Sequence, residues 1–330
     1  MNTQSQPERR SPLIWGWLML VMLVAGAAIP AQGRVNAELG AEIGDAVLAA
    51  AISFTTGSLV MVLLVALLPQ GRRTLRNVRP ALRRGTVKWW YFLAGCVGGY
   101  FVLTQTLTIA LIGVAVYTIA VVTGQTIGGL LWDRIGLGPA GRKRLNGVRV
   151  GGALLTVAAV SVAVSPQLAQ SGRGVDWLLL VLLPLTAGFL QAAQQAVNGR
   201  QSAAYGGPLP GTLINFLAGS AALILAWGVM GLFGNAHFGL SPVWWHYLGG
   251  PLGIVFIALG AYLVTQVGVL LAAMGMIAGQ LLGSLLLDLV VPAPGSVVTA
   301  LTVVGTVLTL LAVVVASLPD FYRGKGNAAR

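Results

Sequence analysis

The stretch of sequence from Ala25 to Gly40 reads AGAAIPAQGRVNAELG, and its spaced pair Gln32-x-x-x-Asn36 recurs 162 residues later as Gln194-x-x-x-Asn198. The same shift, without gaps, superimposes four further pairs of identical residues: Gly44 on Gly206, Phe54 on Phe216, Gly57 on Gly219 and Ser58 on Ser220. A match of this kind indicates a duplicated unit rather than chance similarity.

A second block of the sequence repeats with a shift of 155 residues. Its matching residues are Trp89-Trp90 on Trp244-Trp245, Gly95 on Gly250, Gly98 on Gly253, Phe101 on Phe256, Gly113 on Gly268, Gly124-Gln125 on Gly279-Gln280, Gly128 on Gly283 and Asp133 on Asp288. The shifts of 162 and 155 differ by seven residues, and the difference falls in a connection that is long and basic in the first half. The chain therefore consists of two homologous halves.

Composition excludes a water-soluble fold. Of the 330 residues, 8% are charged and 56% are hydrophobic, whereas about a quarter of the residues in a soluble domain are charged. The mean hydropathy is +0.84. Forty-five glycines suit a helical membrane bundle, in which small residues let helix backbones approach closely. We therefore expect an all-α integral membrane protein.

Apolar runs long enough to cross a bilayer as a helix, about 20 residues each, predict ten spans. They cover residues 13–33, 46–68, 89–107, 111–131, 148–165, 177–198, 211–233, 244–264, 267–287 and 297–318. The predicted division is a tail at 1–12, a first repeat at 13–165, a linker at 166–176, a second repeat at 177–318 and a tail at 319–330. Very short turns near 108–112 and 265–267 predict tight hairpins.

The first span also has features of a cleavable signal peptide. Arg9 and Arg10 precede an apolar run that ends in Ala25-Gly26-Ala27-Ala28. The run is long for a signal peptide, and the repeat makes it the counterpart of an internal helix. We expect this span to be retained.

Each predicted half holds five spans, and an odd number makes the second half start from the opposite side of the membrane. The repeats are therefore expected to be inverted. Inverted repeats commonly place a substrate site near the bilayer midplane, between the halves. This architecture is the main argument for transport by alternating access.

Positive charge is divided unequally between the two sides of the predicted bundle. Eighteen of the 20 lysines and arginines fall on the side that holds both termini, and only Arg34 and Arg173 fall on the other. The positive-inside rule then predicts that both termini are cytoplasmic. The loop from Gly71 to Lys88 has seven positive residues. It is expected to anchor this topology, and a specific contact with anionic lipid is the alternative.

The net charge of +12 therefore indicates membrane topology rather than nucleic-acid binding, because the basic residues lie between apolar runs. Cys96 is the only cysteine and has no disulfide partner within the chain. His237 and His246 lack metal-site spacing and are expected in loops or interfaces. No catalytic constellation can be assembled. We expect no enzyme activity and no cofactor; a monomer suffices for the fold, and a homodimer is compatible with it.

The first-helix sequence AGAAIPAQGRVNAELG, continued by residues 46–57, resembles the opening of the bacterial YdcZ family. The blocks from Val122 to Asp133 and from Ile277 to Asp288, with the frame G-Q-x-x-G-x-x-x-x-D, resemble the closing part of the same unit. This family belongs to the drug/metabolite transporter superfamily, and its typical member has one five-helix unit. The resemblance implies an EamA-like carrier fold of two fused units that moves small molecules across the inner membrane.

The resemblance implies no substrate. The chain also departs from the superfamily in one respect. The small multidrug exporters use a membrane-embedded glutamate in the first helix, whereas residues 13–31 of this chain hold no Asp or Glu.

Polar side chains in membrane spans are costly unless they are paired, so they are the candidates for a solute site. The pairs Gln32/Asn36 and Gln194/Asn198 each share a helix face. They would act as matched gates at the two mouths of a cavity, or would only fix helix packing. A central polar cavity is expected from a further set: Gln125, Gln280, Thr123, Gln105, Gln191 and Asn215. Interhelical hydrogen bonding is the alternative for these residues as well.

Several other glycines and acidic residues have structural interpretations. The pairs Gly124/Gly128 and Gly279/Gly283 are small-xxx-small motifs and are expected to be contact surfaces between the halves. Asp133 and Asp288 lie at helix ends, where a salt bridge or turn bond is favoured over proton coupling. Three acidic residues in the first outer loop are expected to be solvated: Glu38, Glu42 and Asp45.

These features predict a small-molecule transporter with a cavity lined by Gln and Thr rather than by charge. Such a lining suits a neutral, zwitterionic or amphipathic solute. The alternative is a membrane scaffold that binds lipid or a partner protein without transporting. That alternative predicts fully satisfied Gln125 and Gln280 and no pocket that reaches either face.

Overall fold

The computed structural model describes residues 12–139, 141–142, 147–171 and 174–327. Ten helices within this part of the chain are long and apolar enough to cross a membrane, and no strand occurs there. The long helices are α1 (Pro12–Ile43), α2 (Ala46–Leu67), α5 (Ala94–Ile112), α6 (Val114–Ile135), α7 (Gly147–Ser171), α8 (Gly174–Tyr205), α9 (Leu209–Leu232), α10 (Gly249–Val267), α11 (Val269–Val290) and α12 (Ala300–Asn327). The ten predicted spans are confirmed.

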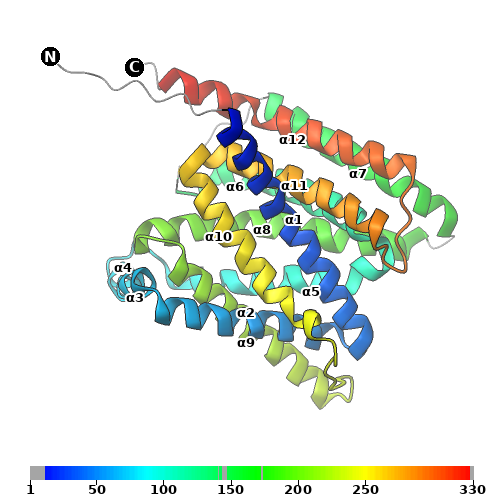
Figure 1. Ribbon diagram of the computed structural model, residues 1–330, viewed down its shortest axis with the longest axis horizontal. Coiled ribbons are helices and arrows are strands. Elements are labelled where there is room, and N and C mark those ends of the chain that lie inside the picture. The colour runs from blue at the N-terminus through cyan, green and yellow to red at the C-terminus, as the bar shows by residue number, and fades with distance from the viewer. Residues whose placement is uncertain (1–11, 140, 143–146, 172–173, 328–330) are drawn as a thin grey trace.

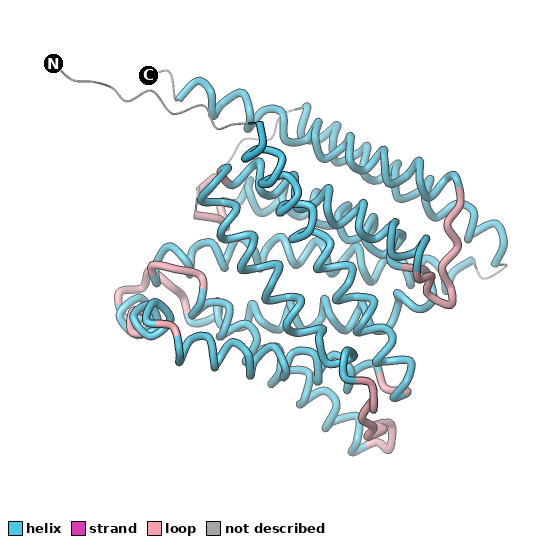
Figure 2. The backbone as a smooth tube through the Cα atoms, in the orientation of Figure 1, coloured by secondary structure: helices cyan, strands magenta, loops and turns pink. Residues whose placement is uncertain are grey.

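Four shorter helices complete the fold (Figure 2). The 3-10 turns η1 (Trp89–Leu93) and η2 (Trp244–Leu248) lead into α5 and α10. The predicted basic loop contains α3 (Pro69–Leu75) and α4 (Val78–Arg83). Pro69 is the first residue of α3, a position that proline tolerates because its missing N–H is not needed there.

Helix α1 continues about ten residues beyond its expected end, to Ile43. Its polar residues Gln32 and Asn36 therefore lie within the helix, and so do Glu38 and Glu42. The chain then turns at Gly44, whose φ of +70° favours glycine. The two tight hairpins turn at Gly113 and Gly268, with φ of +82° and +84°, slightly later than predicted.

The most extensive helix contacts all join one half of the chain to the other (Figure 1). Helix α1 packs along α11, and its repeat counterpart α8 packs along α6. The self-matching pairs are α2 with α9 and α7 with α12. The two halves are therefore related by a pseudo-two-fold axis and do not form separate bundles.

Glycine residues allow the helices of the two halves to pack this closely. A Cβ on Gly124 would lie 2.0 Å from the backbone oxygen of Leu185, and a Cβ on Gly279 would lie 2.3 Å from that of Leu23. These are equivalent contacts between α6 and α8 and between α11 and α1. The prediction that these glycine motifs join the two halves is confirmed.

The bundle has two chemically different ends. The basic end holds α3, α4, the α6–α7 and α8–α9 connections, the start of α1 and the end of α12 (Figure 1). The acidic end holds the α1–α2 and α5–α6 turns and the connections after α9 and α11. Its acidic residues include Glu38, Glu42, Asp45 and Asp288.

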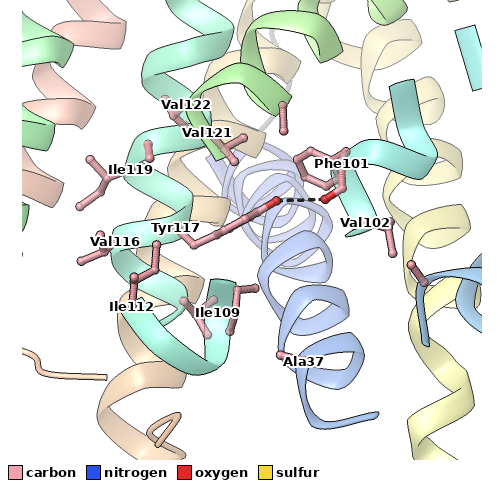
Figure 3. Close-up of a cluster of buried hydrophobic side chains, with 14 of the residues drawn as sticks. Ala37, Phe101, Val102, Ile109, Ile112, Val116, Tyr117, Ile119, Val121 and Val122 are labelled. Atoms are coloured by element: carbon pink, nitrogen blue, oxygen red, sulfur yellow. Dashed lines mark hydrogen bonds between the residues drawn. The ribbon is translucent and has the colours of Figure 1, made fainter. Parts of the chain in front are cut away.

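The apolar core lies between α5 and α6 and the helices around them. Figure 3 shows Tyr117 of α6 extending toward Phe101 of α5, to whose backbone oxygen its hydroxyl donates at 3.3 Å. The same hydroxyl lies 3.0 Å from Thr104 Oγ1. This brace fixes α5, which carries Phe101 and Val102 into the wall of a central cavity.

Candidate functional site

A cavity of about 130 Å³ lies between the halves and is lined by α1, α2, α5, α8, α9 and α10. Its wall contains repeat-related pairs, which are Gln32 with Gln194, Phe54 with Phe216, Gly98 with Gly253, Phe101 with Phe256 and Val102 with Ile257. The Phe54 and Phe216 ring centroids are 5.2 Å apart. Nearby, Ser58 Oγ lies 2.9 Å from Ser220 Oγ. Because each of these two contacts joins a residue to its own counterpart, the pseudo-two-fold axis passes beside the cavity.

Two glutamine amides lie over two glycines in this cavity. A Cβ on Gly98 would be 3.0 Å from Gln194 Nε2, and a Cβ on Gly253 would be 3.0 Å from Gln32 Oε1. The glycines therefore leave room for the amide groups, and a larger side chain would push them aside. None of the residues that line the cavity carries a charge. The cavity offers amide donors and acceptors on an aromatic and aliphatic wall.

Toward the basic end the cavity continues along α8 and α9. Its lining there consists of Gln195, Asn198, Thr212 and Asn215. Asn215 Nδ2 donates to Asn198 Oδ1 at 2.7 Å. Gln195 is exposed, and Asn198 and Thr212 are half-buried.

Toward the acidic end the equivalent positions are filled. Asn36, Ala50 and Ser53 correspond to Asn198, Thr212 and Asn215, and they are 0%, 0% and 1% exposed. Asn36 Nδ2 donates to Gln105 Oε1 at 3.1 Å. Gln105 is completely buried, whereas its counterpart in the second half is Gly260. The cavity is therefore closed on the acidic side by side chains that the basic side lacks.

This closure leaves polar groups unsatisfied. Asn36 Oδ1, Ser53 Oγ and Gln105 Nε2 are buried without a hydrogen-bond partner among the described residues. A buried polar atom without a partner destabilises the conformation that buries it. Three atoms at the basic end are likewise buried without a partner among the described residues, on Gln201, Tyr205 and Asn215, so unsatisfied polar groups do not distinguish the two ends.

Of the ten residues predicted for the site, five line the cavity: Gln32, Gln191, Gln194, Asn198 and Asn215. Gln125 touches it indirectly, because its Nε2 donates to Gln191 Oε1. Asn36 and Gln105 form the closure described above.

The remaining two predicted residues lie away from the cavity. Thr123 donates to the backbone oxygens of Ile119 and Thr156, at 2.9 and 3.2 Å, and so fixes α6 on α7. Gln280 is 4% exposed on α11, where that helix packs on α1. Sequence placed Gln125 and Gln280 centrally, but α6 and α11 lie behind α8 and α1 and contribute no residue to the lining.

The aromatic residues of the site were not among those predicted from the sequence. Phe54, Phe216, Phe101 and Phe256 all line the cavity. They were visible as matched pairs in the repeat alignment. The signal in the sequence is that phenylalanine occupies the same repeat position in both halves. A residue type that both halves share tends to lie near the axis that relates them.

The two aspartates at the repeat ends have different partners. Asp133 pairs with Arg149 at 2.5 Å. Asp288 accepts from the backbone amides of Val114 and Ala115, at 3.1 and 2.7 Å, and caps the start of α6. Both roles are structural, as expected. The Asp288 bonds also tie α11 to α6 at the acidic end.

The expectation of a solvated acidic loop is wrong for Asp45. Its side chain is 5% exposed and accepts from Leu48 N, Trp227 Nε1 and His237 N at 2.9, 3.0 and 3.1 Å. It caps α2 and holds the connection after α9, which covers it from solvent. A loop from the second half, invisible to local sequence reasoning, causes the burial.

Glu38 and Glu42 are also not simply solvated, because they lie on α1 and pair with Arg34 and His246. His246 is 8% exposed at the start of η2 and α10. The expectation that it lies in an interface is confirmed, but its carboxylate partners were not predicted.

Comparison with protein families agrees with the fold and the repeat. A family model described as "Putative inner membrane exporter, YdcZ", of the drug/metabolite transporter class, matches residues 17–162 and again residues 179–315. No curated protein matches the chain. The two matches each cover one half of the bundle. The chain therefore belongs to the YdcZ family of inner-membrane exporters, with two family units fused in one polypeptide.

Proposed function

We propose that this protein exports a small uncharged, zwitterionic or amphipathic solute by alternating access, and that its described conformation is open toward the cytoplasm. The observation that carries the proposal is the cavity beside the pseudo-two-fold axis, closed at the acidic end and continuing toward the basic end. In inverted-repeat carriers, exchanging the conformations of the two halves exchanges which end is open.

The charge distribution supports the orientation. The basic end carries most of the lysines and arginines, and such residues are retained on the cytoplasmic side during insertion. A solute would then enter from the cytoplasm past Asn198 and Thr212 and leave at the acidic end once Asn36 and Gln105 separate.

The lining supports the solute class. Its Gln and Asn amides both donate and accept hydrogen bonds, and its phenylalanines bind apolar surface. A multivalent ion would lose its hydration without a compensating charge. The volume of about 130 Å³ lies below the roughly 300–1,000 Å³ of drug-sized ligand sites. We therefore infer a small solute rather than a bulky drug.

The alternative of a scaffold without transport activity predicts no pocket, and the cavity argues against it. Gln125 is hydrogen-bonded, as that alternative requires, but its partner is itself a lining residue, Gln191.

The test is counterflow of radiolabelled solutes in proteoliposomes, screened over amino acids, polyols, nucleosides and small amphipathic amines. We expect Gln194→Leu to lower the flux of an accepted solute about tenfold, because one desolvated amide contact is worth about 1–2 kcal/mol. Gln280→Leu is the matched control, since Gln280 is buried outside the lining, and it should retain flux within about twofold. Equal loss in both variants, or flux of none of the solutes, would contradict the proposal.

A further inference from the structure

A buried histidine lies between two glutamates at the acidic end, outside the cavity. His246 Nδ1 is 2.7 Å from Glu42 Oε2, and His246 Nε2 is 3.6 Å from Glu38 Oε2. Ser241 Oγ donates to Glu42 Oε2 at 2.5 Å and lies 2.9 Å from His246 Nδ1. Arg34 Nε contacts the other oxygen of Glu38 at 2.8 Å. These contacts join α1 to η2, the turn that begins α10.

The distances assign the protons on the imidazole ring. Ser241 Oγ donates its one proton to Glu42 Oε2, so it accepts from His246 Nδ1, and the neutral ring carries its proton on Nδ1. A second proton would bind Nε2, which faces Glu38. With a neutral ring, Arg34, Glu38 and Glu42 leave one negative charge, and protonation of His246 brings this cluster to neutrality. Protonation therefore strengthens the contact of η2 with α1.

Few other ionisable groups face this cluster from the elements packed against η2. On α2 the ionisable group is the capping Asp45, which is engaged by Trp227 and the backbone of His237. On α10 it is Tyr262, toward the basic end. Two further residues line the same cavity, Ala110 near the end of α5 and Pro294 in the connection after α11, and both are uncharged.

The cluster is reachable by protons. Arg34, Glu38, Glu42 and His246 line a second cavity of about 260 Å³ at the acidic end. The two glutamate side chains are 33% and 34% exposed. Histidine is the side chain whose charge changes between about pH 5 and 8.

The equivalent position at the basic end has different chemistry. By the repeat shifts, His246 corresponds to Tyr91, and Glu38 corresponds to Arg200. Arg200 Nη1 donates to Tyr91 Oη at 3.3 Å, and its other nitrogens donate to backbone oxygens of the α6–α7 connection at 2.7 and 3.4 Å. Arginine and tyrosine do not change charge between about pH 5 and 8. The same contact is therefore titratable at one end only.

We propose that His246, held between Glu38 and Glu42, is a proton-binding site that closes the acidic end of the carrier. A proton arriving from the compartment at the acidic end binds Nε2, ion-pairs with Glu38 and holds η2 and α10 against α1. Loss of that proton leaves an uncompensated negative charge and favours opening. The inference rests on the proposed alternating access, and it makes the return of the empty carrier sensitive to external pH.

The test uses Ser53→Cys as a reporter, in full-length protein with Cys96→Ala, reconstituted in nanodiscs. Ser53 is 1% exposed at the closed acidic end, so its thiol reacts with a maleimide only when that end opens. Maleimide reacts with the thiolate, so each rate is divided by that of Asn235→Cys, an exposed site in the same region, to remove the effect of pH on the reagent.

We expect the normalised rate to fall about threefold or more between about pH 8 and about pH 5.5, the range in which histidine gains its proton. His246→Gln, and independently His246→Tyr, which copies the basic-end residue, should abolish the pH dependence. His237→Gln, an exposed histidine in the same connection, should preserve it. A pH-independent rate in the parent, or a pH dependence that survives both His246 variants, would overturn the proton site alone. Absence of labelling at every pH would overturn alternating access as well.

Discussion

The two ends of the central cavity carry the same Gln-x-x-x-Asn motif, but the cavity is closed at the acidic end and continues toward the basic end. At the acidic end Gln32 lines the cavity, but Asn36 is buried against Gln105. At the basic end both Gln194 and Asn198 line the cavity. The repeat therefore fixes where a closure can form, and non-repeated residues such as Gln105 determine which end closes.

The rest of the scaffold is symmetric to within small differences. A Cβ on Gly26 would lie 2.0 Å from the backbone oxygen of Met276, and a Cβ on Gly188 would lie 2.1 Å from that of Val121. A carrier that alternates between two related conformations is expected to have symmetric helix contacts and, in each conformation, one open and one closed end. Substitutions that change the packing or the hydrogen bonds of one end test this difference between the two ends.

The largest effect is expected where the ends do not differ. Gly26→Ala and Gly188→Ala should each destabilise the protein by about 3 kcal/mol, because the added methyl group overlaps a helix backbone that cannot move alone. Thermal unfolding in detergent measures the loss. Gly129→Ala, which meets nothing within 4 Å, is the control and should unfold at the parent temperature. A large effect in only one of the two glycine variants would argue against equivalent contacts.

Gly249→Ala should break the closure of the acidic end. Its Cβ would lie 2.0 Å from Asn36 Oδ1 and 2.5 Å from Ser53 Oγ. The equivalent residue at the basic end is already Ala94. We expect about a tenfold faster labelling of Ser53→Cys, since overpacking costs about 1–3 kcal/mol. The reciprocal variant Ala94→Gly should leave that rate unchanged, and unchanged labelling in Gly249→Ala itself would show that the acidic end is not tightly closed.

Gln105→Leu should weaken the same closure by less. It removes the hydrogen bond to Asn36 while keeping most of the side-chain volume. Such a bond contributes about 1 kcal/mol, so Ser53→Cys should label about fivefold faster. Leu107→Ala, on the exposed side of α5, is the control. Slower labelling in Gln105→Leu would mean that the unpaired Gln105 Nε2 costs more than its bond to Asn36 contributes.

Asn215→Ser should have the smallest effect. It gives the basic end the residue that the acidic end has at position 53 and removes the bond to Asn198. Because Asn198 is half-buried, water replaces the lost partner, and labelling of Ser53→Cys should change by less than about twofold. A change as large as that of Gly249→Ala would show that the basic end controls the acidic end directly.

The sequence alone predicts the number of spans, the inverted repeat and the glycine contacts between the halves, because each depends on patterns that local physics enforces. Apolar length determines a span, and a retained glycine marks a close backbone approach. Gln32, Gln194 and Asn198 were expected as gates at the two mouths or as packing contacts, and they lie in the cavity lining. Of the residues expected in the central cavity, Gln191 and Asn215 also lie there.

Other features depended on contacts between segments far apart in the chain. Gln280 and Thr123 were expected in the cavity, yet α11 and α6 lie behind the lining helices. Asp45 was expected in water, yet the connection after α9 covers it. The pairing of His246 with Glu42 joins residues about 200 positions apart in sequence, and no local pattern encodes it.

The most direct test of the account asks from which side the cavity can be reached. Gln194→Cys, with Cys96→Ala, would be labelled with a membrane-impermeant maleimide in inside-out and in right-side-out membrane vesicles. The account predicts fast labelling in inside-out vesicles, where the basic end faces the reagent, and slower labelling in right-side-out vesicles, where the acidic end must first open. Labelling from the acidic side alone, or at the same rate from both sides, would contradict a cavity whose described conformation is closed at the acidic end and open to the cytoplasm.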